Sequence, residues 1–134
     1  TELFIHAEDY FEEFETGQAL QGSAYDVLQQ YFKKYAALNA EPGQEFAQVL
    51  VTREGRAFLG GSRDFEKKLE ALLAHYQQEG QLNTSRTAAE WCEYLFICAR
   101  GVLFDWSIHP STDYDVEKKM HFVIGNALQA MLQK

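Results

Sequence analysis

The sequence has only two cysteines, Cys92 and Cys98, among 134 residues. Their spacing places them about 240° apart around a helix, so they cannot form a disulfide with each other. A small secreted fold held together by disulfides is therefore not expected, and unpaired cysteines suit a reducing cytoplasm. We expect both cysteines to be buried structural residues, with a reactive thiol as the alternative.

Long apolar runs and clustered basic residues are also missing. No apolar run approaches the roughly 18 residues of a membrane span, and Thr1 opens directly into helix-like sequence rather than into a signal peptide. The 20 acidic residues outnumber the 12 basic ones, which gives a formal charge of −8. Because affinity for a phosphate backbone comes from clustered Lys and Arg, we expect no DNA contact by this chain itself and no membrane association.

Recognisable catalytic and metal-binding patterns are lacking too. Glu117 and His121 share a helical face, but no second carboxylate–histidine pair accompanies them. Asp105, Ser107 and His109 have the composition of a catalytic triad, yet a spacing of two within a helix points them apart. The other histidines are scattered, at His6 and His75. We therefore expect neither an enzyme nor a bound metal or other cofactor.

Aromatic residues, by contrast, are abundant: ten Phe, seven Tyr and two Trp. So many aromatic side chains are expected either in a large hydrophobic core or around a small-molecule cavity. Apolar residues recur at helical spacing almost throughout, which predicts one all-α domain over residues 1–134. We expect an antiparallel bundle of about six helices, over residues 3–14, 23–39, 45–51, 64–79, 88–109 and 113–131. For 45–51 a strand is the alternative, because the segment ends in Val-Leu-Val.

Capping residues and turn formers separate these helices. Ser23, Thr87 and Asp113 are the predicted N-caps of three of them, and Thr87 begins a capping box with Glu90. The predicted helix breaks are Pro42–Gly43, Gly80 and Pro110.

The predicted helix over 88–109 has two opposite apolar faces. One face contains Ala88, Cys92, Leu95, Phe96, Ala99, Val102, Leu103 and Trp106. The other contains Tyr94, Ile97, Gly101, Phe104 and Ile108. A surface helix needs only one apolar stripe, so two stripes imply burial against two bodies. We expect the second body to be another copy of the chain.

A family resemblance rests on the same region. The turn at Glu79–Gly80 leads into a long apolar helix with a central Gly101, then Trp106, then Pro110. With this pattern, the C-terminal half resembles the penultimate helix of TetR-family transcriptional regulators and its lead-in. The opening residues 1–14, TELFIHAEDYFEEF, are similar to the helix that follows the family's DNA-reading module. That helix-turn-helix module is not among these residues.

The resemblance implies a ligand-binding and dimerisation domain. The last two helices of each copy would form a four-helix bundle, and a small apolar or aromatic effector would bind among the preceding helices. Effector binding would shift the spacing of the DNA-reading modules, which this chain does not contain. The expected interface comprises Tyr94, Ile97, Gly101, Phe104, Ile108, Val123, Ile124, Ala127, Leu128 and Met131. The expected ligand-binding residues are Tyr10, Phe11, Phe14, Tyr31, Tyr35, Phe58, Phe65, Trp91 and Cys92.

Two alternatives stay open on the sequence. One is a dimeric helical interaction protein with a fully packed core and no effector. The other is a metal-dependent helix-bundle enzyme, which would need convergent polar groups around His75 or His121. For each single ligand-binding candidate, ordinary core packing competes with a role in a pocket.

Overall fold

A computed structural model describes residues 22–40, 63–109, 111 and 113–134. Four helices occupy these ranges: α2 (Ala24–Ala40), α5 (Arg63–Gln78), α6 (Ala88–Ile108) and α7 (Val116–Met131). The all-helical prediction is confirmed for this part of the chain, where the only β-type pairing is an isolated antiparallel bridge between Leu82 and Leu132. The predicted helices over 3–14 and 45–51 lie outside the described residues.

Local hydrogen bonds explain where the helices begin and end. The Thr87 capping box is formed, with Thr87 Oγ1 accepting from Glu90 N and the Glu90 side chain accepting from Thr87 N. Ser23 Oγ likewise accepts from Asp26 N at the start of α2. Gly80 follows α5 with a φ of +81°, a conformation that glycine adopts without a Cβ clash.

One predicted cap is wrong. The N-cap of α7 is Asp115, whose side chain accepts from Lys118 N, and not Asp113. Asp113 lies in the preceding turn, where its backbone N–H donates to Ser111 Oγ. Both aspartates suit a cap, so only the register of the turn decides between them.

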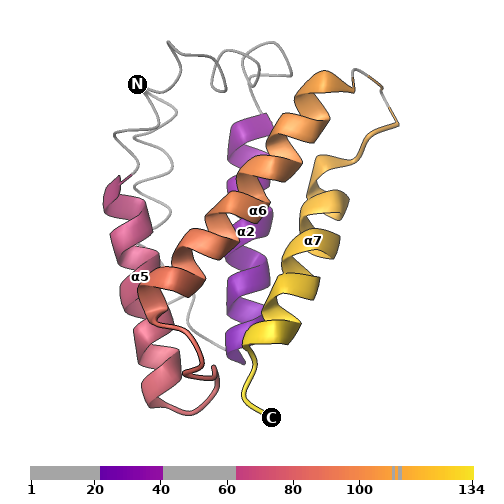
Figure 1. Ribbon diagram of the computed structural model, residues 1–134. Helices are drawn as coiled ribbons and strands as arrows, with labels where there is room; N and C mark the ends of the chain where they lie inside the picture. The colour runs from indigo at the N-terminus through magenta and orange to yellow at the C-terminus, as the bar shows by residue number, and fades with distance from the viewer. Residues whose placement is uncertain (1–21, 41–62, 110, 112) are drawn as a thin grey trace.

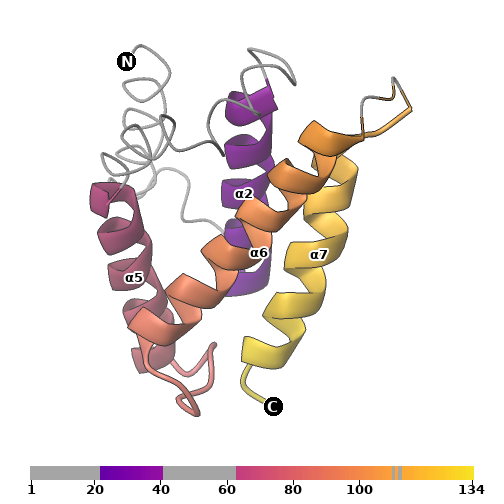
Figure 2. The ribbon, with the colours of Figure 1, turned by 45° about the horizontal axis from the view of Figure 1, so that its top comes forward.

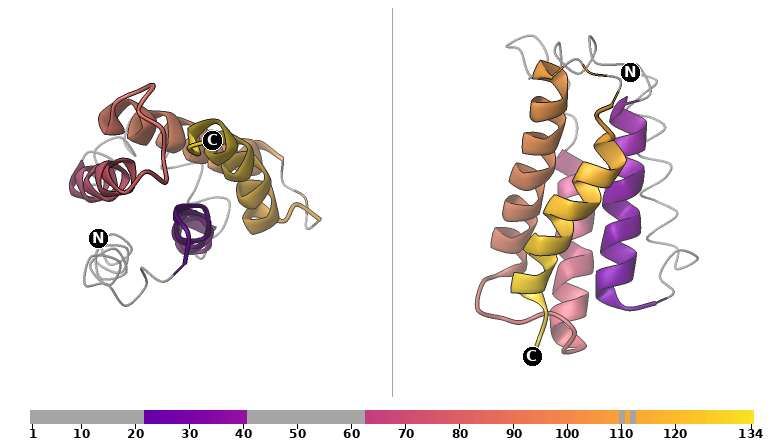
Figure 3. Two further views of the ribbon diagram at one scale, coloured as in Figure 1. Left: turned by 90° about the horizontal axis from the view of Figure 1, so that it is seen from below. Right: turned by 90° about the vertical axis from the view of Figure 1, so that its right-hand side faces the viewer.

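The helices alternate in direction along the chain (Figure 1). α6 runs diagonally across α2 with α5 on one side and α7 on the other, as the tilted view also shows (Figure 2). Seen from below, α2 lies on one side of α6, and the opposite side of α6 faces away from the described helices (Figure 3). Among the described helices, none has the length and apolar character needed to cross a bilayer.

The core forms where α2, α6 and α7 meet. Phe32 on α2, Leu95 on α6 and Leu128 on α7 are among the largest side chains that are fully buried. Each such side chain stabilises the fold by about 1.5–3 kcal/mol. This three-way packing buries the predicted inner face of α6 and therefore leaves its other face outward.

The loop after α5 ties together two distant helix ends. Gln81 Oε1 accepts a 2.6 Å hydrogen bond from Ala24 N at the start of α2. Asn83 Nδ2 donates to Ala130 O at 2.9 Å, and Asn83 N donates to Met131 O at 2.8 Å, at the end of α7. These bonds satisfy backbone groups that the helices themselves leave unpaired.

Asn83→Ala is expected to lower the free energy of unfolding by about 1–3 kcal/mol, because terminal carbonyls of α7 lose their side-chain donor. Urea denaturation followed by far-UV circular dichroism measures this loss. Thr84→Ala, an exposed neighbour, serves as the control. Equal stabilities of the two variants would contradict the proposed role of Asn83.

Candidate functional site

α6 carries a row of exposed apolar residues on its outer side. Tyr94, Ile97, Phe104 and Ile108 are 40, 57, 48 and 52% exposed. With Gly101 they recur at alternating spacings of three and four residues, the spacing of a helix–helix seam. We call these five residues the outer stripe.

The outer stripe has polar contacts on both flanks. On one flank Arg100 forms an ion pair with Glu66 of α5. On the other, Tyr114 Oη donates a 2.7 Å hydrogen bond to Asp105 Oδ2, and burial is the main cause that raises the pKa of Tyr114. An apolar centre with a polar rim is the usual anatomy of a protein–protein interface.

The predicted interface residues of α7 require a correction. Ile124, Leu128 and Met131 have no exposed surface in the single chain, and Ala127 is only 3% exposed. Helix α7 uses this stripe to pack against α2 and α6, so these side chains cannot reach a second copy. The apolar stripe of α7 is buried as predicted, but it is buried against helices of the same chain and not against a second copy.

Two other α7 residues retain accessible surface. Val123 is half-buried at the edge of the core, and Phe122 is 65% exposed. Phe122 lines a shallow surface depression of about 490 Å³ with Tyr114, Lys118 and Lys119. Lys119 Nζ lies 5.7 Å from the centre of the Tyr114 ring.

Two predicted ligand-binding residues of α2 lie in an aromatic cluster with α6. The cluster consists of Tyr31, Phe32, Tyr35 and Phe96, and its rings meet edge to face at centroid distances of 5.0–6.0 Å. Tyr31 and Phe32 are almost completely buried, at 2 and 0% exposure. In the described part of the chain, these two side chains therefore act as packed core.

Polar groups adjoin one edge of this cluster. The guanidinium carbon of Arg100 lies 5.4 Å from the centre of the Phe96 ring, within reach of a cation–π interaction. The pKa of Tyr35 is raised to about 12, mainly by burial. The nearby charge of Arg100 opposes this increase, and that of Glu66 adds to it. Tyr35 is therefore neutral at physiological pH and has a hydroxyl close to a charged pair.

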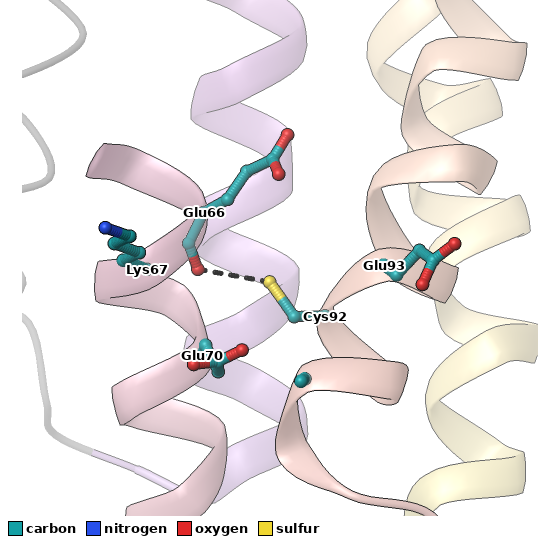
Figure 4. A pocket seen from close by; sticks show the side chains of 6 residues that line it. Glu66, Lys67, Glu70, Cys92 and Glu93 are labelled. Atoms are coloured by element: carbon teal, nitrogen blue, oxygen red, sulfur yellow. Dashed lines mark hydrogen bonds between the residues drawn. The ribbon is translucent and has the colours of Figure 1, made fainter. Parts of the chain in front are cut away.

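A groove of about 260 Å³ separates α5 from α6 beside that pair. Its lining is largely acidic: Glu66, Lys67, Glu70, Ala89, Cys92 and Glu93. Figure 4 shows the Cys92 thiol directed at α5, where Sγ donates a 3.2 Å hydrogen bond to Glu66 O, while the Lys67 ammonium points away. Three carboxylates around a narrow groove favour cations over anions.

Cys92 is a poor nucleophile in this setting. Burial is the main cause that raises the pKa of its thiol to about 12, with further contributions from Glu66 and Glu70. The pKa of Cys98 is also raised by burial, but Tyr94 partly offsets the increase and Cys98 is more exposed. The expectation of a buried structural cysteine is thus confirmed for Cys92.

At pH 8 a thiol reagent such as DTNB is expected to modify Cys98 at least tenfold faster than Cys92, because only a thiolate reacts. Cys98→Ser should remove the fast phase, and Cys92→Ala should retain it. A fast phase that survives Cys98→Ser would show that the Cys92 thiol is accessible and ionised.

The structure places the other predicted ligand-binding residues as follows. The rings of Trp91 and Tyr94 are tilted against each other with centroids 5.9 Å apart, and the buried Trp91 Nε1 has no hydrogen-bond acceptor among the described residues. It therefore lies at the N-terminal end of the outer stripe rather than with Tyr31. Tyr10, Phe11, Phe14 and Phe58 lie outside the described residues, as does the side chain of Phe65.

Within the described residues, no group of three or more His, Cys, Asp or Glu side chains is placed to hold a metal ion. His75 pairs with Glu79 and His109 with Asp105, each across one helical turn and with exposed side chains. Ser107 Oγ donates a 2.7 Å hydrogen bond to Phe104 O, and His109 Nδ1 lies 2.8 Å from Asp105 O. The His75 contact lies at the end of α5 and the other contacts lie at the end of α6, and each of them links residues within about one helical turn.

Three residues around the groove were missing from the predicted site: Glu66, Phe96 and Arg100. Phe96 was assigned to the inner face of its helix, and its contact with Arg100 is local, because the two residues lie four apart on α6. A single Arg within a long apolar helix was an available signal, since such a charge needs a partner. Glu66 carried no comparable signal, because it lies in the charged segment EKKLE.

Comparison of the chain with protein-family models, curated proteins and solved structures found no match.

Proposed function

We propose that this chain is the homodimerisation and effector-binding domain of a transcriptional regulator resembling the TetR family. The observation that carries the proposal is the outer stripe, an apolar seam from Tyr94 to the end of α6 at Ile108, opposite the face that fills the core. A 21-residue helix extends over about 30 Å, long enough for a helix–helix interface.

A second copy of the chain is the partner that the seam favours. The exposed apolar residues occupy heptad positions, which pack by interdigitation with another helix. An identical stripe supplies the same spacing, and a two-fold interface requires that one surface fit itself. The antiparallel neighbour α7 then brings half-buried Val123 to the edge of a four-helix arrangement.

Effector binding is proposed for the region between α2, α5 and α6. Support comes from the aromatic cluster, the adjoining Arg100–Glu66 pair and the groove beside Cys92. An apolar body would contact the cluster at the half-buried Tyr35, and polar groups would orient it. Effector and DNA would favour different arrangements of the two copies, with a coupling of about 1–3 kcal/mol.

Sedimentation equilibrium of the wild-type chain tests the dimer, which we expect at micromolar concentrations. A chain that stays monomeric up to about 100 μM, equivalent to a binding free energy weaker than about −5.5 kcal/mol, contradicts the proposal.

A thermal-shift screen with small aromatic and apolar compounds tests the effector. A ligand at 100 times its Kd should add about 2.7 kcal/mol of stability. Tyr35→Ala, at the half-buried ring of the aromatic cluster, should reduce that gain without changing the oligomeric state, whereas Phe104→Glu should change the oligomeric state.

A dimeric interaction domain without an effector is the second candidate. The observation favouring it is the close packing of Tyr31 and Phe32 against α6, which fills the space between these helices. A screen in which no compound stabilises a proven dimer would favour this candidate.

A further inference from the structure

Gly101 occupies the middle of α6, where the single chain gives no reason for a glycine. Its φ is not in the positive range, and apart from its chain neighbours and the nearby backbone of α6 itself, no atom of the described residues lies within 4 Å of the position that a Cβ would take. Glycine is nearly the least favourable residue for a helix interior, because it loses the most backbone freedom on folding. A Cβ would therefore fit here, and most other residue types would stabilise the helix.

Gly125 shows what a helix-interior glycine does elsewhere in this fold. A Cβ at Gly125 would lie 2.8 Å from Gln29 Nε2 and 3.0 Å from Tyr25 Oη. The missing side chain lets α7 approach α2, and Gln29 Nε2 then donates a 3.0 Å hydrogen bond to His121 O. Glycine in this position marks a close approach between two helices.

We propose that Gly101 is the point at which the α6 helices of two copies cross, backbone against backbone. This inference rests on the proposed dimer and specifies its central contact. Glycine at a crossing allows the closest separation of two helix axes, and it removes the side chain that would hold them apart.

The position of Gly101 within the outer stripe favours a copy of this chain as the occupant. Tyr94 and Ile108 lie seven residues to either side, and Ile97 and Phe104 lie four and three residues away. The apolar pattern therefore nearly matches its own reverse about Gly101. A two-fold contact centred there apposes large apolar residues on both sides of the axis and buries the greatest length of both stripes.

The test compares the wild-type full chain with Gly101→Ala and Gly101→Leu. Sedimentation velocity over a dilution series gives the dimer Kd, and thermal unfolding of the dilute monomer gives its Tm. Gly101→Ala should raise the monomer Tm by roughly 2–5 °C while weakening the dimer about tenfold. Gly101→Leu should weaken it by about 100-fold, because a large side chain overpacks the crossing. The control Gln129→Leu adds the same side chain at an exposed position of α7 and should leave the dimer unchanged.

These opposite effects on monomer and dimer separate a crossing from a general loss of stability. Gly101→Leu and Gly101→Ala variants that dimerise with the wild-type Kd would overturn the crossing while leaving the dimer in place. A wild-type chain that does not dimerise would overturn both the crossing and the proposed function.

Discussion

Replacing Phe104 with glutamate is expected to weaken the dimer by roughly 150- to 5000-fold while leaving the helical fold intact. Phe104 is 48% exposed in the single chain, so the monomer can accommodate a charge there. In the dimer the carboxylate would be buried without a partner, at a cost of about 3–5 kcal/mol. Sedimentation equilibrium measures the change in Kd, and far-UV circular dichroism verifies the fold.

Two matched variants sharpen this result. Phe104→Leu keeps an apolar side chain at the seam and should keep most of the affinity. Phe122→Glu places the same charge at a residue that is 65% exposed but lies outside the outer stripe. If Phe122→Glu and Phe104→Glu weaken the dimer equally, the interface is broader than the outer stripe. If Phe104→Glu leaves the dimer Kd unchanged, the outer stripe is not part of the interface.

Leu128→Ala is expected to lower the free energy of unfolding by about 2–5 kcal/mol, even at concentrations where the chain is monomeric. Leu128 has no exposed surface, and its truncation leaves a cavity between α7 and its neighbours. Urea denaturation of the dilute protein measures the loss. Gln129→Ala, the exposed next residue, should change stability by no more than about 0.5 kcal/mol.

The same experiment distinguishes core from interface. If Leu128 contacted a second copy, its truncation would raise the dimer Kd and leave the dilute monomer as stable as the wild type. The burial of Ile124 and Met131 beside it leads us to expect the same behaviour at all three positions.

The two variants also bear on the transcriptional-regulator proposal. An effector domain couples ligand binding to the relative position of two copies. It therefore needs a dimer interface with more than one packing arrangement and a core that keeps each copy folded. Outer-stripe variants should change oligomeric state and coupling, whereas core variants should change the stability of each copy. A ligand whose affinity is the same in Phe104→Glu as in the wild type would bind without sensing the dimer.

The sequence by itself determined the helices in the described part of the chain and the caps at Ser23 and Thr87, but not the cap of α7. Apolar spacing placed α2, α5, α6 and α7 to within a few residues, because that spacing reflects the helical repeat and needs no tertiary information. The Thr87 capping box was equally local, since all of its atoms lie within one turn. The two faces of α6 followed from the same repeat.

Only the tertiary structure decided what each apolar face contacts. Periodicity shows that Leu128 and Phe104 both lie on apolar stripes, but it does not show which helix covers each stripe. The packing of α2, α6 and α7 buries the apolar stripe of α7 and leaves the outer stripe of α6 exposed. The meeting of Arg100 with Glu66 was likewise beyond the sequence, because α5 and α6 are brought together by long-range packing. Helical repeat is a property of neighbouring residues, whereas burial depends on the whole chain and on the partners it binds.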